Sequence, residues 1–368
     1  MHQSMVQVRD GAAIVHPEGR RGRGAVSNAS GRYEPVHNVT LDDGWGMLDT
    51  PPPPRKTTVM LDTTRTIIAR NTSPDIPFDR SINAYRGCEH GCVYCYARPT
   101  HAFHDLSPGL DFETKLFAKP NAAALLRAEL GKRGYSPAPI AMGTNTDPYQ
   151  PIEATYRLTR QVLEVCLETR HPVTITTKSA RVVRDLDLLA ELAKLNLTAV
   201  SISVTSLEPK LSGLLEPRAS SPAKRLDALA QLAAAGVPAH VSIAPVVPAI
   251  TDEFIERILE EAAARGVKTA SWIMLRLPHE VAPLMREWLE VHFPDRAGKV
   301  MGIVQSVRGG KDYDSQFFER MKPKGVWADV FRTRFRIACQ RLGLNREAPQ
   351  LDCSQFVAPR SDGQLSLL

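Results

Sequence analysis

The chain has 368 residues, which is enough for one large domain with extensions or for two ordinary domains. Its hydrophobic fraction of 43% and charged fraction of 23% are those of a globular protein, and no run approaches the ~18 apolar residues of a membrane helix, so a membrane-spanning protein is excluded. The formal net charge of +6 permits attraction to polyanions without establishing it, and the lack of an apolar N-terminal region predicts a cytoplasmic protein.

Residues 1–60 are predicted to form a flexible arm. They contain a basic run at 20–24, a polar stretch at 27–32 and four prolines at 51–54, with too few apolar residues to build a core. Arginines interleaved with glycines suit a phosphate backbone, although a charge run is more often a solvated tail. The arm is therefore a candidate for contact with a partner.

Residues 61–280 alternate short apolar runs with longer amphipathic stretches. Strands are predicted near 82–85, 139–142, 173–176, 198–204, 239–244 and 269–275, and helices near 121–130, 159–169, 183–195, 223–235 and 252–265. A strand every 25 to 40 residues after the first interval is typical of a strand plus its crossover helix, so we expect a parallel sheet curled into a full or partial barrel. Residues 281–358 are predicted to be a mostly helical extension, and 359–368 a flexible tail.

Three of the six cysteines lie within eight residues. Cys88, Cys92 and Cys95 have the spacing C-x3-C-x2-C directly after the first predicted strand, which is unlike a disulfide framework. Three thiolates on a tight loop would leave one iron of a four-iron cluster free for an exogenous ligand. The alternative is a zinc site. Its fourth ligand would be His90, His101 or His104.

This cysteine spacing, with the aromatic Tyr94 before the third cysteine, resembles the signature of the radical S-adenosylmethionine (SAM) superfamily. The resemblance implies an α/β fold with a partial (β/α)6 barrel. It also implies a [4Fe-4S] cluster whose unique iron chelates SAM, and reductive cleavage of SAM to a 5′-deoxyadenosyl radical. An electron donor such as flavodoxin or ferredoxin would supply the reducing electron.

Further passages, at 81–88, 143–151, 176–179, 201–205 and 216–219, resemble the photolyase-named branch of that superfamily, which includes spore photoproduct lyase. The resemblance covers about residues 64–345 and implies a repair-type lyase acting on DNA. The chain departs from that lyase at 142–146, where a hydrogen-donating cysteine is expected and none is present. Among the remaining cysteines, Cys166 lies on an apolar helix face, so Cys353 is the candidate donor.

The side chains that follow the predicted strands are candidate SAM contacts, since a barrel presents such residues at one mouth. Lys178 ends the third strand and could meet the SAM carboxylate, or it could be a solvated lysine. Hydroxyls and a carboxylate at the ends of the second and fourth strands suit the ribose and amino groups of SAM, although each could instead cap a helix. These residues are Thr144, Thr146, Asp147, Ser203 and Thr205.

Arg218 is a candidate clamp for the SAM carboxylate or a substrate phosphate, with an ion pair to Glu216 or Glu208 as the alternative. Tyr94 and Tyr96 flank the third cysteine, where their rings could cover the adenine, shield the cluster or simply pack in the core.

The last five residues, Gln364 to Leu368, resemble the short motif with which bacterial repair and replication proteins dock on the DNA sliding clamp. Together with the basic arm, this favours DNA or another nucleic acid as the substrate. The sequence therefore predicts a radical SAM enzyme acting on DNA. The alternatives are radical modification of RNA or protein, and a binding protein that holds a cluster or zinc without turnover.

Overall fold

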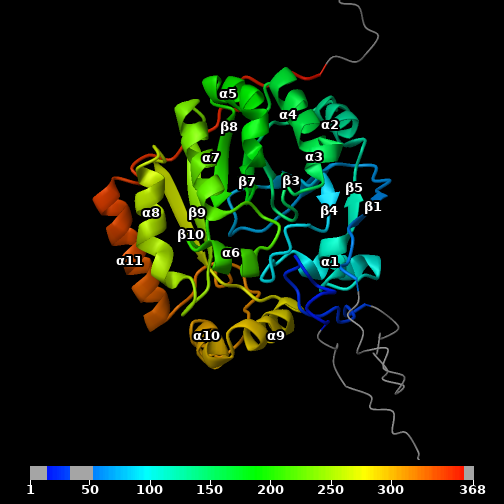
Figure 1. Ribbon diagram of the computed structural model, residues 1–368. Coiled ribbons are helices and arrows are strands. Elements are labelled where there is room, and N and C mark those ends of the chain that lie inside the picture. Colours follow the sequence, from blue (N-terminus) through cyan, green and yellow to red (C-terminus); the bar gives the residue numbers. More distant parts are fainter. Residues whose placement is uncertain (1–14, 34–52, 360–368) are drawn as a thin grey trace, which may run out of the picture.

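The computed structural model describes residues 15–33 and 53–359, and one twisted parallel sheet organises them (Figure 1). Six strands are hydrogen-bonded in chain order from one edge to the other, and a short antiparallel strand, β2, extends the first edge. The parallel strands are β3 (Arg80–Ile82), β6 (Ile140–Met142), β7 (Val173–Thr177), β8 (Thr198–Ser203), β9 (Ala239–Val246) and β10 (Thr269–Met274), and β2 is Ile68–Arg70. This open sheet confirms the predicted partial (β/α)6 barrel.

The long amphipathic segments form the crossover helices. They lie together on one face of the sheet (Figure 1), and their apolar sides bury against the strands because a right-handed crossover returns each helix to that face. The helices are α2 (Ala122–Leu130), α4 (Leu158–Glu168), α5 (Leu186–Lys194), α7 (Pro222–Ala234) and α8 (Ile255–Ala263), with shorter turns η1 (Arg98–His104), α1 (Asp111–Thr114), α3 (Glu153–Tyr156), η2 (Ala180–Asp185), α6 (Pro209–Leu215) and η3 (Asp252–Phe254).

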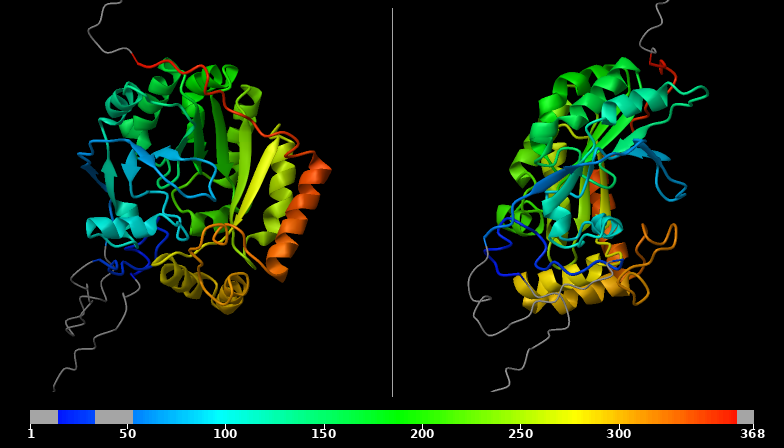
Figure 2. Two further views of the ribbon diagram at one scale, coloured as in Figure 1. Left: turned by 180° about the vertical axis from the view of Figure 1, so that it is seen from behind. Right: turned by 90° about the vertical axis from the view of Figure 1, so that its right-hand side faces the viewer.

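The opposite face of the sheet is polar, and the helices do not cover it in the view from behind (Figure 2). In β8 the residues alternate, with Val200 and Ile202 fully buried toward the helices and Ser201 half-buried on the other side. The strand register aligns Ser201 with His240, and His240 with Thr269. The inner face of the barrel therefore presents hydroxyls and an imidazole to whatever enters it.

The sequence did not predict a second sheet of three strands beside β3. Its strands are β1 (Thr58–Leu61), β5 (Lys115–Ala118) and β4 (Tyr85–Arg86), in the order β1-β5-β4. The first predicted strand, 82–85, is thus divided between two sheets, because the chain leaves the main sheet after Ile82 and pairs with β5 at Tyr85. Because of this break, the cysteine loop that follows β4 lies at the end of the barrel.

The expectation of a flexible arm over 1–60 is wrong for the parts that the structure describes. Residues 15–33 pack against the barrel, with Ala25 and Val26 fully buried, and residues 58–60 belong to β1. Segment 15–33 is held by long-range partners: Leu110 N–H donates to the carbonyl of Ser27 at 3.2 Å. Residues 1–14 and 34–52 of the predicted arm lie outside the described residues.

Residues 281–359 contain three helices and two long irregular segments. The helices are α9 (Val281–His292), α10 (Pro294–Ser306) and α11 (Val326–Leu342). The final described segment runs along the end of the sheet where the parallel strands begin, since the N–H of Asp352 donates to Asn196 and that of Val357 to Thr169. In the part of the chain that the structure describes, no helix is long and apolar enough to cross a bilayer.

Candidate active site

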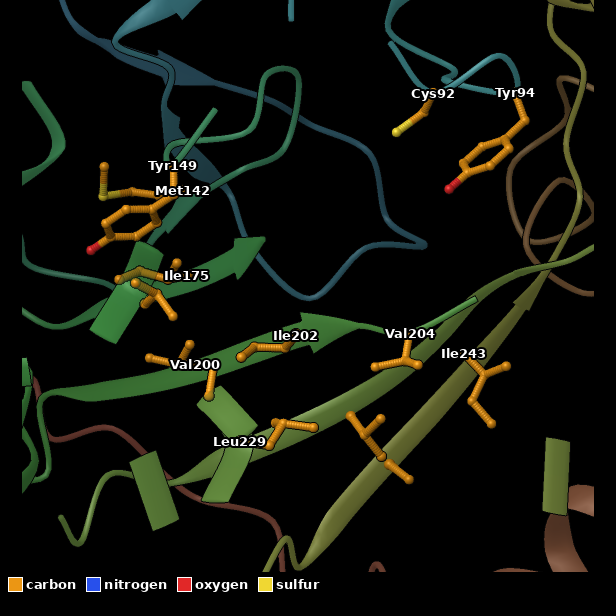
Figure 3. Close-up of a cluster of buried hydrophobic side chains, with 14 of the residues drawn as sticks. Cys92, Tyr94, Met142, Tyr149, Ile175, Val200, Ile202, Val204, Leu229 and Ile243 are labelled. Atoms are coloured by element: carbon orange, nitrogen blue, oxygen red, sulfur yellow. The ribbon is translucent and has the colours of Figure 1, made fainter. Parts of the chain in front are cut away.

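The three clustered cysteines follow β4 on a loop at the end of the sheet where the parallel strands finish. Cys88 and Cys92 are buried, Cys95 is half-buried, and all three are free thiols. The loop is anchored by backbone hydrogen bonds, from Cys88 N–H to Phe112 at 2.9 Å and from Val93 N–H to Leu215 at 3.2 Å. Figure 3 shows Cys92 and Tyr94 projecting from this loop toward the strands.

A buried ion pair holds the loop in place. Arg98 and Glu113 are fully buried and their charged atoms lie 2.5 Å apart. Arg98 also donates to the carbonyls of Cys92 at 2.9 Å and Gly91 at 3.2 Å. Sequence reasoning missed both members of this pair, because they matter through contacts that the sequence does not display.

Glu113 also ties the N-terminal segment to the cysteine loop. Its two carboxylate oxygens accept from the N–H groups of Gly24 at 2.9 Å and of residue 25 at 2.8 Å. Gly91 has a φ of +70°, and an added Cβ there would lie 2.6 Å from a Glu113 oxygen. Glycine is needed at position 91 because the cysteine loop packs directly against the Glu113 carboxylate.

Gly24 permits the closest approach. A Cβ on Gly24 would lie 1.7 Å from the carbonyl oxygen of Gly91, so Gly24→Ala should displace either the arm or the cysteine loop. We expect the variant to lose about 1–3 kcal/mol of unfolding free energy, measured by urea denaturation. Gly298→Ala is the control, because that site in α10 is open and should gain about 0.5–1 kcal/mol. An unchanged unfolding free energy in Gly24→Ala would contradict the packing of segment 15–33 against the cysteine loop.

The chemistry of the three thiols suits an iron–sulfur cluster. Burial is the largest cause that raises the pKa of each thiol, so thiolates here need compensating positive charge. The Lys178 ammonium acts in the opposite direction, lowering the pKa of Cys92 and Cys95. Soft thiolate donors in an apolar setting select iron–sulfur clusters or zinc.

Each candidate fourth ligand of a zinc site uses one ring nitrogen elsewhere, although Nδ1 of His101 is buried without a partner among the described residues. His90 Nδ1 lies 3.3 Å from Asp147, His101 Nε2 lies 2.9 Å from a backbone carbonyl, and His104 Nε2 lies 3.3 Å from Arg86. The cysteine spacing and the bonds of these imidazoles therefore favour a three-cysteine cluster site, with zinc as the alternative.

Lys178 lies beside the cysteine loop, directly after β7. Its ammonium is 5.8 Å from the centre of the Tyr94 ring, and within the described residues no carboxylate lies within ion-pair distance of it. A half-buried lysine without an anionic partner is suited to bind an anion. The contact with the SAM carboxylate remains a prediction.

Replacing Lys178 with methionine tests that contact. We expect the SAM concentration for half-maximal cleavage to rise roughly ten- to hundredfold, since a charged hydrogen bond contributes about 1.5–3 kcal/mol. Lys178→Arg should recover part of the loss, and the exposed Lys132→Met should match wild type. An unchanged half-maximal concentration in Lys178→Met would exclude the contact.

Asp147 is a positioning residue in this structure. Its oxygens accept from Thr177 Oγ1 and from the N–H of Lys178, both at 2.7 Å, and His90 lies alongside. Burial by itself raises the pKa of Asp147, but His90 and the hydrogen bonds that the carboxylate accepts lower it to about 2. The carboxylate therefore fixes the end of β7, and its predicted contact with SAM remains a prediction.

The two threonines after β6 bond within the protein. Thr144 Oγ1 accepts from Asn83 at 3.2 Å, and Thr146 Oγ1 donates to the carbonyl of Tyr85 at 3.2 Å. Asn83 also accepts from the N–H groups of residues 145 and 146. The Thr144 hydroxyl connects the residues that follow β3 and β6, and the Thr146 hydroxyl connects the end of β6 to β4. Both hydroxyls therefore shape the barrel mouth and do not cap a helix.

A second buried network centres on Glu216, which the sequence analysis named only as a partner of Arg218. Its carboxylate accepts from Tyr94, from Thr205 at 2.7 Å and from Arg225. Burial by itself raises the pKa of Glu216, whereas Arg225 and Lys178 lower it. Tyr94 and Thr205 are therefore held by this network, next to the cysteine loop.

Arg218 pairs with neither predicted carboxylate. It lies 2.9 Å from Glu89, inside the cysteine loop, and its backbone N–H donates to the carbonyl of His90 at 3.2 Å. Arg225, and not Arg218, neutralises Glu216 because it enters from the start of α7. Arg218 thus braces the cysteine loop and keeps an exposed fraction of 40% toward solvent.

Tyr96 and Ser203 lie at the mouth. Tyr96 is 47% exposed, its hydroxyl donates to the carbonyl of Thr144, and the Arg276 guanidinium lies 5.1 Å from the centre of its ring. Ser203 is buried at the end of β8, aligned with Ser242. Arg276 follows β10 and was not predicted, although its position after a strand end was the signal that would have found it.

Cys353 does not belong to this site. Asp352, its neighbour, bonds to Asn196, which precedes β8, whereas the clustered cysteines lie where the strands finish. Figure 1 shows this final segment crossing the end of the sheet opposite α6. The prediction of Cys353 as hydrogen donor is therefore wrong, because the chain after α11 returns along the end of the sheet where the strands begin.

This fold and site define a class, and comparison with known proteins agrees. A profile described as the Radical SAM superfamily matches residues 82–262. An uncharacterized protein of Methanocaldococcus jannaschii is 31% identical over 246 residues, 67% of this chain and 86% of that protein. The chain belongs to the radical SAM superfamily.

Two further similarities refine the picture. An uncharacterized protein of Mycobacterium tuberculosis is 37% identical over 222 residues, which are 60% of this chain and 65% of that protein, so the match spans less than two thirds of the relative's length. Spore photoproduct lyase complexed with dinucleoside spore photoproduct has a TM-score of 0.56 at 17% identity, covering 78% of this chain and 80% of that one. The second likeness concerns the fold.

Proposed function

We propose that this protein cleaves SAM reductively at a [4Fe-4S] cluster and uses the resulting radical on DNA. The observation that carries the proposal is the set of three buried or half-buried thiols on one loop beside the ammonium of Lys178. When bound, such a cluster passes one electron from a reduced donor protein to SAM, whose S–C5′ bond breaks to give methionine and a 5′-deoxyadenosyl radical.

The protein's own residues hold and orient the reactants. Cys88, Cys92 and Cys95 would bind three irons, and Lys178 would neutralise the SAM carboxylate. Tyr96 and the hydroxyls of the inner sheet face would enclose the adenosyl group. The buried pairs at Glu113 and Glu216 keep the loop fixed, so that little reorganisation is needed when SAM binds.

A nucleic-acid substrate is supported by three observations. The chain carries a formal charge of +6, and an exposed aromatic ring lies beneath an arginine at the mouth, where Tyr96 meets Arg276. A structure of a spore photoproduct lyase variant with bound AdoMet and dinucleoside spore photoproduct shares the fold, with a TM-score of 0.55. This chain has no cysteine at 142–146, so the same lesion is not proposed as its substrate.

The proposal is tested by following label transfer. Single-stranded DNA and RNA pools deuterated in the base and sugar carbons are incubated anaerobically with the reconstituted protein, SAM and a reductant. Deuterium in 5′-deoxyadenosine from the DNA pool alone is the expected result. Transfer from RNA alone would replace DNA with RNA modification, and the absence of transfer from either pool would overturn the nucleic-acid assignment.

Docking on the DNA sliding clamp is part of the same proposal. Residues 364–368 lie outside the described residues, so the support is the sequence motif alone. Clamp binding should disappear when these residues are deleted. Unchanged binding would remove the clamp from the account.

A further inference from the structure

Segment 306–325 runs from the last residue of α10 to the residue before α11. It lines a pocket of about 410 Å³. That volume suits a small ligand or one unit of a larger one. Its charged lining residues are Arg308, Lys311, Lys322 and Lys324, with Asp314 and Glu319. Lys324 pairs with Glu319, which leaves three cations facing a single carboxylate, Asp314.

Arg308 is a buried cation without a carboxylate partner among the described residues. It is only 6% exposed, and its terminal nitrogens donate to the backbone carbonyls of Leu275 at 3.0 Å and Arg320 at 3.4 Å. Its Nε is buried and has no hydrogen-bond partner in the described part of the protein. Burying a charge without an ion pair is costly. Asp314 attracts Arg308 from within the lining but does not lie at ion-pair distance, so the pocket keeps an excess of positive charge.

A second arginine increases that excess of positive charge. Burial is the largest cause that lowers the pKa of Arg308, and repulsion from Arg276 is the next, whereas Tyr313 and Asp314 act in the opposite direction. Across segments 15–33 and 53–359, no ion pair joins either arginine to a carboxylate. An anion bound here would relieve both the desolvation and the repulsion.

The same segment is fastened across the open side of the barrel. Arg320 donates to Asp75 from Nε at 2.8 Å and from Nη2 at 2.6 Å, although Asp75 lies between β2 and β3 at the far edge of the sheet. Arg276 donates to the sulfur of Met321. Figure 2 shows both loops projecting on the side of the sheet away from the large helices.

These interactions connect the pocket to the cysteine loop. Arg308 bonds to Leu275, the next residue is Arg276, and Arg276 lies over Tyr96, which follows Cys95. In the same segment as the pocket, the rings of Phe317 and Phe318 are each 51% exposed. Exposed aromatic rings beside cations are typical of surfaces on which nucleic-acid bases stack.

We propose that the pocket of segment 306–325 binds a backbone phosphate of a single-stranded nucleic acid, while Phe317 and Phe318 stack on its bases. This inference rests on the proposed function, because it names the element that holds the nucleic acid near the radical. Phosphate matches the lining better than a carboxylate ligand would, since three cations surround one site. Base stacking adds to phosphate binding, so the pocket and the two rings together bind the backbone and the bases of one strand.

The test measures binding without SAM turnover. Fluorescence anisotropy of a labelled twelve-nucleotide single strand, as DNA and as RNA, is recorded with the cluster-loaded full chain over a range of salt concentrations. Lys311→Ala/Lys322→Ala should weaken binding of either strand roughly tenfold at low salt and reduce the salt slope by about 0.7 for each phosphate that the variant no longer neutralises. Phe317→Ala should weaken binding with little change in the slope.

The matched control is Lys132→Ala/Lys268→Ala, which removes the same charge from exposed lysines outside segment 306–325. Arg308→Gln, checked for folding by thermal denaturation, probes the buried cation directly and should also weaken binding. Equal weakening in the control and pocket variants would overturn the proposal, as would unchanged binding in the pocket variants. Because reduction and SAM cleavage play no part in the assay, its failure is distinct from failure of the proposed function, which the label-transfer experiment measures.

Discussion

Glu113→Gln is expected to lower the free energy of unfolding by about 3–5 kcal/mol, because fully buried Arg98 would lose its counter-charge. The amide also cannot accept from Arg98 and both N–H groups of the N-terminal segment as the carboxylate does. Since the same arginine holds two carbonyls of the cysteine loop, the variant should also retain less iron after reconstitution.

The control for this prediction is an exposed ion pair. Arg127 and Glu168 lie 2.7 Å apart with about half of each side chain in water, so Glu168→Gln should cost less than about 1 kcal/mol. Urea denaturation of both variants provides the comparison. If the two variants lose similar stability, the buried pair does not carry the role assigned to it.

Cys92→Ala is expected to abolish both cluster incorporation and SAM cleavage. Two thiolates would remain for a cluster that requires three from this loop. The fold itself should persist, because Cys92 is one small side chain in a large core. Iron and sulfide content, the visible absorption of the reconstituted protein and its 5′-deoxyadenosine yield measure the effect.

Cys353→Ala is the matched control for that variant. Cys353 lies at the opposite end of the sheet, where the parallel strands begin, so its replacement should leave iron content and 5′-deoxyadenosine yield at the wild-type level. A wild-type iron content in Cys92→Ala would remove Cys92 from the ligand set. A loss of cleavage in Cys353→Ala would restore that residue to the site.

The main sheet was predictable because its strands are local patterns of apolar residues. The runs at 173–176, 198–204 and 269–275 differ from the observed β7, β8 and β10 by one residue at the C-terminal end. The sequence analysis did not predict the open, polar inner face, although Val200, Ser201 and Ile202 alternate between apolar and polar. A strand buried on both faces would be apolar throughout, so this alternation is the signal that would have found it.

The docked arm and the second sheet could not be predicted in the same way. Residues 15–33 contain few apolar side chains, and they are held by Glu113 and by the close approach of Gly24 to the cysteine loop. Those hydrogen bonds to Glu113 join positions almost ninety residues apart. Local composition carries no record of a partner at that distance, which is why the segment resembled a flexible arm.

The site shows the same division between local and distant information. Cys88, Cys92 and Cys95 are recognisable by their spacing, and Lys178 by its place after a strand. The partners of the charged residues cannot be recognised in the sequence. Arg218 pairs with Glu89 because the 216–218 turn packs on the cysteine loop. Residue type identified the candidate groups, and tertiary contacts determined which of them remain available to a ligand.

The most direct test of radical SAM chemistry is the product of SAM in a single anaerobic incubation. The reconstituted full chain is mixed with SAM and a chemical reductant, and 5′-deoxyadenosine and methionine are quantified against Cys92→Ala and against a sample without reductant. We predict equal amounts of the two products, in wild type alone and only after reduction. Wild-type yields no greater than those of Cys92→Ala would contradict the account.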